Sequence, residues 1–189
     1  KLDLLGDIKH EDACAFLNKY KEIYQDDFTF HVLLTKYSTS IDTINEEINW
    51  LNTNRYEIKS HDAIDYIRIL RKHQRWADLA EFSQCHLPNE YVFAVAGYLS
   101  ESEDEHFVKV RCTLYQKLVD LDWKRKGLYF NFGVVHRQLG HPEEAKAYFQ
   151  KEFDLFEDMT SLAALIQLRY SLNEYLTDGY FDQLKRCVD

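Results

Sequence analysis

Apolar residues recur every three or four positions along almost the whole chain, with polar residues between them. The pattern starts at Ala13, Phe16/Leu17 and Tyr20, and this spacing places the apolar side chains on one face of an α-helix. Comparable stripes follow at 41–51, 63–70, 76–82, 92–99, 107–118, 128–139, 145–156, 162–172 and 181–188. The pattern therefore predicts an all-α fold.

The segment 28–34, Phe-Thr-Phe-His-Val-Leu-Leu, also suits a β-strand by composition. A single strand has no partner elsewhere in this pattern, because strands are stable only when they pair. We therefore expect a helix over this segment as well.

Short polar breaks separate the apolar stripes, which favours helices joined by tight turns. In the sequence Gly140-His141-Pro142, glycine suits the left-handed position after a helix and proline suits the first position of the next one. Thr160 or Ser161 is the expected N-cap of the helix that follows.

Helices of this length in alternation suggest helical hairpins, and successive hairpins predict a repeat along the sequence. The first helices of successive hairpins are expected to begin near His61, Pro88, Lys126 and Thr160. These starting points are about 33 residues apart on average, close to the period of about 34 residues found in one class of helical repeat.

The composition agrees with an all-α fold and indicates which kinds of partner are disfavoured. The 189 residues include only 6 Gly and 2 Pro, fewer than a β-sandwich or a doubly wound fold of this length needs for its turns. The formal net charge of −9 disfavours nucleic acid, whose phosphates need a basic surface. No segment has the roughly 20 apolar residues that span a bilayer, so we expect no membrane insertion.

The four cysteines, Cys14, Cys85, Cys112 and Cys187, are far apart and form no Cys-x-x-Cys pair. We interpret them as reduced thiols that pack mostly in the core, which favours a cytoplasmic location. The chain begins with Lys1 rather than Met, and we expect it to be part of a longer protein.

Residues 126–159 read KGLYFNFGVVHRQLGHPEEAKAYFQKEFDLFEDM and resemble a tetratricopeptide repeat (TPR). The resemblance is carried by six residues at the small, aromatic and turn positions of that family: Tyr129, Phe132, Gly133, Gly140, Ala145 and Phe149. Gly133 and Ala145 are small enough for two paired helices to approach closely, and the aromatic residues fill the space around that contact.

The same unit departs from the family pattern at three positions. His136 replaces the usual tyrosine, Glu152 the usual alanine and Glu157 the usual proline, and we expect these residues to weaken the packing. The resemblance implies antiparallel helical hairpins stacked as a TPR-like α-solenoid. We expect a single domain over 1–189, with divergent helices in 1–60, TPR-like hairpins in 61–176 and a capping helix at 179–188.

The resemblance further implies a scaffold module that binds another protein or a peptide in a concave groove. The positions that usually face this groove are occupied here by Phe130, Val134, Arg137 and Gln138. The alternative is that a neighbouring helix of the same chain covers the two apolar residues. Some TPR domains clamp a carboxylate with Lys and Asn at the positions of Phe130 and Val134, so we do not expect that clamp.

Candidate catalytic and metal-binding patterns are weak. Cys85 and His86 are adjacent in sequence, which does not by itself make a nucleophile and a base. The acidic segment 101–106 lacks the alternating ligands and the glycine of a calcium-binding loop. We therefore predict no catalytic residue, no metal site, no cofactor and no enzymatic activity.

Two further interpretations remain open at this point. In the first, the chain is a peptide-sensing regulatory domain of a larger signalling protein or transcription regulator. A separate DNA-binding or enzymatic domain of that protein would then produce the response. A weaker alternative is self-association through exposed aromatic residues at an end of the array.

Overall fold

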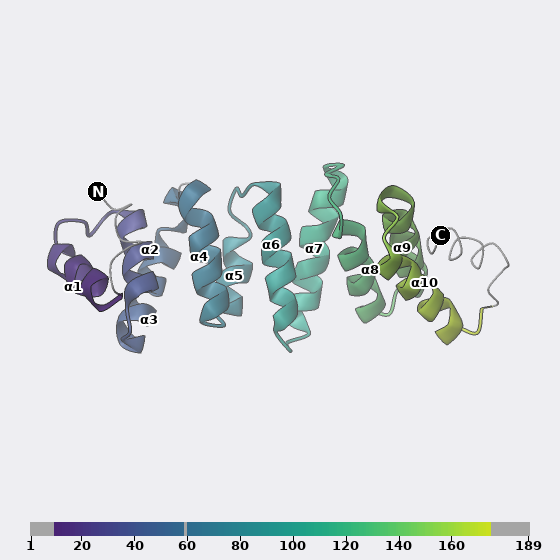
Figure 1. The fold of residues 1–189 in the computed structure, drawn as a ribbon, viewed down its shortest axis with the longest axis horizontal. Coiled ribbons are helices and arrows are strands. Elements are labelled where there is room, and N and C mark those ends of the chain that lie inside the picture. Colours follow the sequence, from purple (N-terminus) through teal and green to yellow (C-terminus); the bar gives the residue numbers. More distant parts are fainter. Residues whose placement is uncertain (1–9, 59, 175–189) are drawn as a thin grey trace. The chain divides into compact units, whose positions relative to one another are not determined.

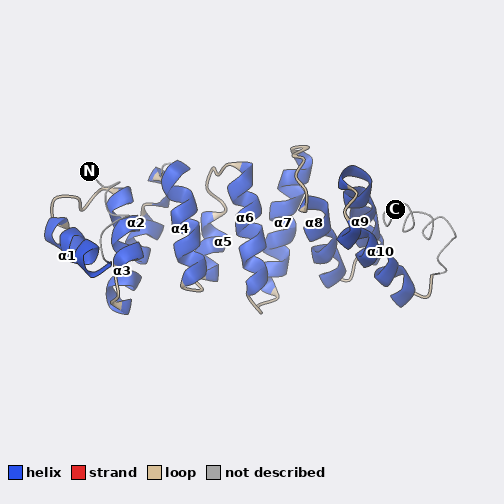
Figure 2. Cartoon of the chain, in the orientation of Figure 1, coloured by secondary structure: helices blue, strands red, loops and turns tan. Residues whose placement is uncertain are grey.

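The computed structural model describes residues 10–58 and 60–174, and within these ranges every regular element is helical (Figure 2). The prediction of an all-α chain is therefore confirmed for the described residues. The chain divides after Tyr98 into two compact units, called here the N-terminal unit and the C-terminal unit. The boundary lies inside the range 61–176, so the expected hairpins are shared between the two units.

The elements follow one another along the chain as labelled in Figure 1. The N-terminal unit contains α1 (His10–Tyr20), α2 (Phe28–Tyr37), α3 (Ile41–Thr53), the 3₁₀ helix η2 (Arg55–Glu57), α4 (Ser60–Lys72), α5 (Trp76–Phe82) and α6 (Asn89–Tyr98). The C-terminal unit contains the 3₁₀ helix η3 (Leu99–Glu101), α7 (His106–Asp120), α8 (Leu128–Gln138), α9 (Pro142–Phe156) and α10 (Met159–Ser171).

A helix begins close to each of the four positions at which the sequence predicts the start of one. Helices α4, α6, α8 and α10 begin within two residues of the predicted positions. The expected capping helix at 179–188 lies outside the described residues.

The strand-like segment 28–34 forms most of helix α2, as predicted. The Asp27 carboxylate accepts a hydrogen bond of 2.8 Å from the backbone N–H of Phe30 and caps the helix. Phe30 and Leu34 are buried with Leu17 of α1 in one core cluster. The segment is apolar because it lies in a core, and a helix satisfies its backbone without a partner strand.

The N-terminal unit holds a buried charged group, Glu47 of α3, which is 2% exposed. One carboxylate oxygen accepts a hydrogen bond of 2.6 Å from the Lys21 ammonium, and the other contacts Nδ1 of His31. The second ring nitrogen of His31, Nε2, lies 2.8 Å from the carbonyl oxygen of Gln25. The imidazole ring of His31 stacks on Trp50, with 3.6 Å between the ring centres.

We expect Glu47→Gln to lower the stability of the N-terminal unit by about 2 kcal/mol at neutral pH. Burial by itself raises the pKa of Glu47, but hydrogen bonds from His31 and Lys21 outweigh it and hold the pKa below its ordinary value of 4.5. The ionised carboxylate therefore stabilises the fold above the unfolded-state pKa, and this contribution is lost as the pH falls through the folded-state pKa. Urea unfolding of both proteins between pH 7 and acid pH measures the effect.

The difference in stability between wild type and Glu47→Gln should shrink as the pH falls below about 4.5. Glu46→Gln is the control, since Glu46 is the exposed neighbour of Glu47 on the same helix. A difference that stays constant with pH would show that the loss comes from packing and not from the charge.

In the C-terminal unit, α8 packs on α7 and α9, and α9 packs on α10. Helix α8 approaches α9 closely at Gly133, as the sequence predicts. A Cβ atom built on Gly133 would lie 2.7 Å from two ring carbons of Phe149 and 3.2 Å from the carbonyl oxygen of Ala145. Phe149 and Ala145 are fully buried, so the absence of a side chain at position 133 allows the contact.

The turn between α8 and α9 also follows the prediction. Gly140 has a φ of +77°, in the left-handed region, and Pro142 is the first residue of α9. The N-cap of α10 differs from the expected Thr160 or Ser161, because Asp158 takes that place and accepts a hydrogen bond of 2.9 Å from the backbone N–H of Ser161. Asp and Ser are equally good caps, so the sequence pattern alone did not separate them.

The expectation that Glu152 weakens the hairpin is wrong. Its side chain is fully buried, and its carboxylate accepts hydrogen bonds from the backbone N–H groups of Gly127 (2.5 Å), Tyr129 (3.0 Å) and Phe130 (3.3 Å). Glu152 of α9 therefore caps the N-terminus of α8, where the first N–H groups have no partner within the helix and the helix dipole favours negative charge.

Candidate functional site

The structure places two of the predicted groove residues against the core of their own unit. Phe130 and Val134 are half-buried and pack on a cluster formed by α9 and α10. The buried members of this cluster are Ala145, Phe149, Leu165 and Leu168. A neighbouring helix thus covers part of both apolar side chains, which was the alternative that the sequence left open.

The other two predicted residues lie at the end of α8. Arg137 is exposed, and Gln138 is also exposed but is held by a hydrogen bond. Its side-chain oxygen accepts a bond of 3.2 Å from Nη1 of Arg111 in α7. The four predicted residues therefore have different surroundings. Phe130 and Val134 pack on a core, Arg137 faces solvent, and Gln138 lies at the edge of a pocket.

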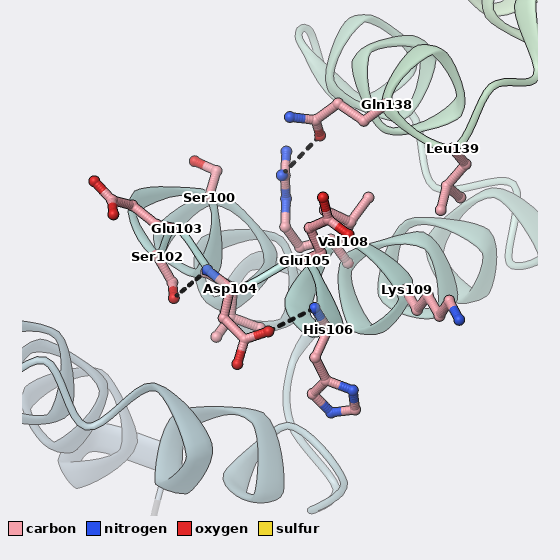
Figure 3. A pocket seen from close by; sticks show the side chains of 12 residues that line it. Ser100, Ser102, Glu103, Asp104, Glu105, His106, Val108, Lys109, Gln138 and Leu139 are labelled. Carbon is pink, nitrogen blue, oxygen red and sulfur yellow. Dashed lines mark hydrogen bonds between the residues drawn. The ribbon is translucent and has the colours of Figure 1, made fainter.

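That pocket has a volume of about 700 Å³ and lies between the segment before α7 and the end of α8 (Figure 3). Its lining residues come from η3 and the segment 102–106, from the first turns of α7 and from Gln138 and Leu139. The Asp104 carboxylate accepts a hydrogen bond of 2.8 Å from the N–H of His106 and fixes the entry into α7. The Asp104 N–H donates in turn to the Ser102 hydroxyl at 3.3 Å.

The residue that distinguishes this pocket is Arg111, which is only 5% exposed. Its Nε is buried and has no hydrogen-bond partner, and within the described residues its guanidinium forms no ion pair. Burial lowers the pKa of Arg111, and the neighbouring Tyr115 phenol offsets part of that effect. Burial likewise raises the pKa of Tyr115 to about 12, so the phenol is uncharged at neutral pH and supplies no counter-charge.

Sequence reasoning missed Arg111, although the sequence contains a signal for it. Arg111 lies in the apolar stripe of α7, four residues after Phe107 and three before Leu114, and so faces the core. Charged residues are rarely buried unless another group pairs with them, so a charged residue at a core-facing position is a candidate functional residue. The candidate site is therefore the pocket at Arg111 and Gln138, of which only Gln138 was predicted.

The weak catalytic and metal patterns gain no geometric support in the part of the chain that the structure describes. Cys85 is buried and His86 is exposed, and burial raises the pKa of the Cys85 thiol despite the opposing effect of Arg55. A protonated thiol is a poor nucleophile. Among residues 10–58 and 60–174, no three His, Cys, Asp or Glu side chains are grouped closely enough to hold a metal ion.

Comparisons with known proteins leave the chain without an assigned family. No family model matches the sequence, and a search of curated proteins finds no match either. None of the described helices combines the length and the apolar character needed to cross a bilayer.

Proposed function

We propose that this chain is a scaffold module that binds a protein or a peptide through TPR-like helical hairpins. The observation that carries the proposal is the contact of α8 with α9 at Gly133. A side chain there would collide with Phe149, so this pair of helices depends on the small residue that the TPR resemblance singles out. Tyr129 and Phe132 are buried beside this contact, as that resemblance implies.

The order of packing in the C-terminal unit supports the same proposal. Helix α10 packs on α9, and its buried Leu165 and Leu168 join Phe149 of α9 in one cluster. A hairpin of this kind cannot bury its apolar face alone and uses the next helix to complete its core. The repeated units of helical-repeat proteins stack in this way and leave an extended surface for partners.

The part of the predicted groove that is open to a partner is centred on Arg137. This residue is exposed at the end of α8, while the half-buried edges of Val134 and Phe130 lie about one and two turns earlier on the same helix. An arginine beside apolar edges is a common anchor for peptides, because it offers several donors to a carboxylate or a carbonyl group. We therefore propose a mixed surface in which Arg137 supplies the polar contact.

We expect Arg137→Ala to weaken peptide binding by about tenfold, because interface arginines often contribute this much. Peptides that bind the wild-type chain would be selected from a peptide array and then titrated by fluorescence anisotropy. Lys124→Ala is the matched control, since Lys124 is an exposed cation of the same unit outside α8. Equal affinity in all three proteins would overturn the assignment of Arg137, and the absence of any binding peptide would overturn the proposed function.

A further inference from the structure

The pocket beside Arg111 combines a buried cation with an acidic rim. Arg111 is buried but forms no ion pair among the described residues, and its side-chain hydrogen-bond partners there, the Gln138 amide and the Tyr115 phenol, are neutral. Burying a charge is costly unless an opposite charge compensates for it. The Arg111 guanidinium is therefore removed from water without a compensating negative charge. An anionic group from outside the chain would supply that charge.

The rim has the opposite character. Glu103 and Glu105 both line the pocket and are exposed (Figure 3). Neither carboxylate has a recorded hydrogen bond or ion pair within the described part of the chain, whereas Asp104 is engaged by the N–H of His106. The pocket therefore presents a buried positive charge from Arg111 and two available negative charges at Glu103 and Glu105, and its rim also carries Asp104 and the exposed Lys109.

We propose that this pocket binds a small zwitterion of the amino-acid class, whose carboxylate pairs with Arg111 and whose cationic groups face Glu103 and Glu105. A planar carboxylate matches the fork of donors on a guanidinium. The volume of about 700 Å³ lies in the usual range for small-molecule sites. Glu103 and Glu105 disfavour a phosphate dianion through repulsion, and Arg111 disfavours a simple cation.

This site does not depend on the proposed peptide surface. Of the four predicted groove residues, Gln138 lines the pocket, whereas Arg137, Phe130 and Val134 do not. Arg137→Ala therefore tests the peptide surface, whereas ligand titrations and substitutions at Arg111, Glu103 and Glu105 test the pocket.

The first test compares ligands that differ by one charged group. The whole 189-residue chain would be titrated by calorimetry with L-arginine, with agmatine, which is the same molecule without its carboxylate, and with propionate, which has a carboxylate and no amine. L-Arginine should bind at least about tenfold more tightly than either of the other two, because only it satisfies both ends of the pocket. Equal binding of L-arginine and agmatine, or no heat from L-arginine at millimolar concentration, would overturn the proposal.

The second test uses variants of the pocket. Arg111→Met keeps most of the side-chain volume and removes the charge, so it should abolish L-arginine binding while the melting temperature of the ligand-free protein stays the same or rises. Glu103→Gln and Glu105→Gln change only exposed side chains and should each weaken binding several-fold. Lys117→Met, on an exposed position of α7 outside this pocket, should bind normally.

The melting temperature separates a ligand site from a structural role. If Arg111→Met lowers the melting temperature and both glutamine variants bind L-arginine as well as wild type does, then Arg111 is a structural residue and the proposal fails.

Discussion

Gly133→Ala should lower the free energy of unfolding of the C-terminal unit by about 2 kcal/mol, although alanine is the better helix former. In a free helix the change would gain up to about 1 kcal/mol. Here the new Cβ would lie 2.7 Å from the ring of Phe149 and 3.2 Å from the carbonyl oxygen of Ala145. Phe149 is fully buried, so its ring cannot relieve the collision by turning into solvent, and we expect the collision to outweigh the gain. Urea unfolding followed by circular dichroism measures the difference.

Gly97→Ala in α6 of the N-terminal unit is the matched control. Gly97 also lies within a helix, but apart from its neighbours in that helix no atom of the described residues lies within 4 Å of the position that its Cβ would take. This variant should be as stable as wild type or gain up to about 1 kcal/mol. Adding Phe149→Leu to Gly133→Ala should make the loss smaller than the sum of the two single changes, because the leucine leaves room for the methyl group. A Gly133→Ala protein as stable as Gly97→Ala would refute the close contact of α8 and α9.

Glu152→Ala is expected to cost about 3 kcal/mol, because it removes a buried carboxylate that accepts three backbone hydrogen bonds. The N–H groups of Gly127, Tyr129 and Phe130 would then lack their acceptor at the start of α8. Glu152→Gln keeps one acceptor oxygen but turns an amide donor towards N–H groups, and we expect an intermediate loss. Thermal unfolding of wild type, Glu152→Gln and Glu152→Ala at neutral pH measures the order of their stabilities.

The comparison residue is Glu144, an exposed carboxylate in the first turn of the same helix. Glu144→Ala loses only a favourable interaction with the helix dipole, which is worth less than about 1 kcal/mol at an exposed position. A loss of similar size at positions 144 and 152 would contradict the role of Glu152 as a cap.

The α8–α9 hairpin shows which parts of this fold the sequence predicts. The pairing of Gly133 with Phe149 was predictable, since a small residue and a large one at defined spacings imply a close approach of two helices. The role of Glu152 was not predictable from the same pattern. Its partners are backbone N–H groups 22 to 25 residues away, and backbone groups have no sequence signature. In the sequence, Glu152 is therefore only an acidic residue within an apolar stripe, which is unfavourable. The structure adds the backbone N–H groups that donate to its carboxylate.

The candidate site shows the same difference. Gln138 was predicted from its position on α8, but its partner Arg111 comes from another helix, 27 residues earlier. The position of Arg111 in the apolar stripe of α7 was visible in the sequence, whereas the hydrogen bond from its guanidinium to Gln138 depends on how α7 and α8 pack. Phe130 and Val134 were correctly placed on one face of α8, but α10 was needed to show how much of that face remains open.

The carboxylate of Glu152 also changes how the first turn of α8 opens. The N–H groups at the start of a helix ordinarily fray alone, because no helical bond holds them. In this protein they are bound to the middle of α9, so releasing them requires the two helices to separate. Local fraying is thereby coupled to opening of the whole hairpin, and the start of α8 becomes part of a single cooperative unit with α9.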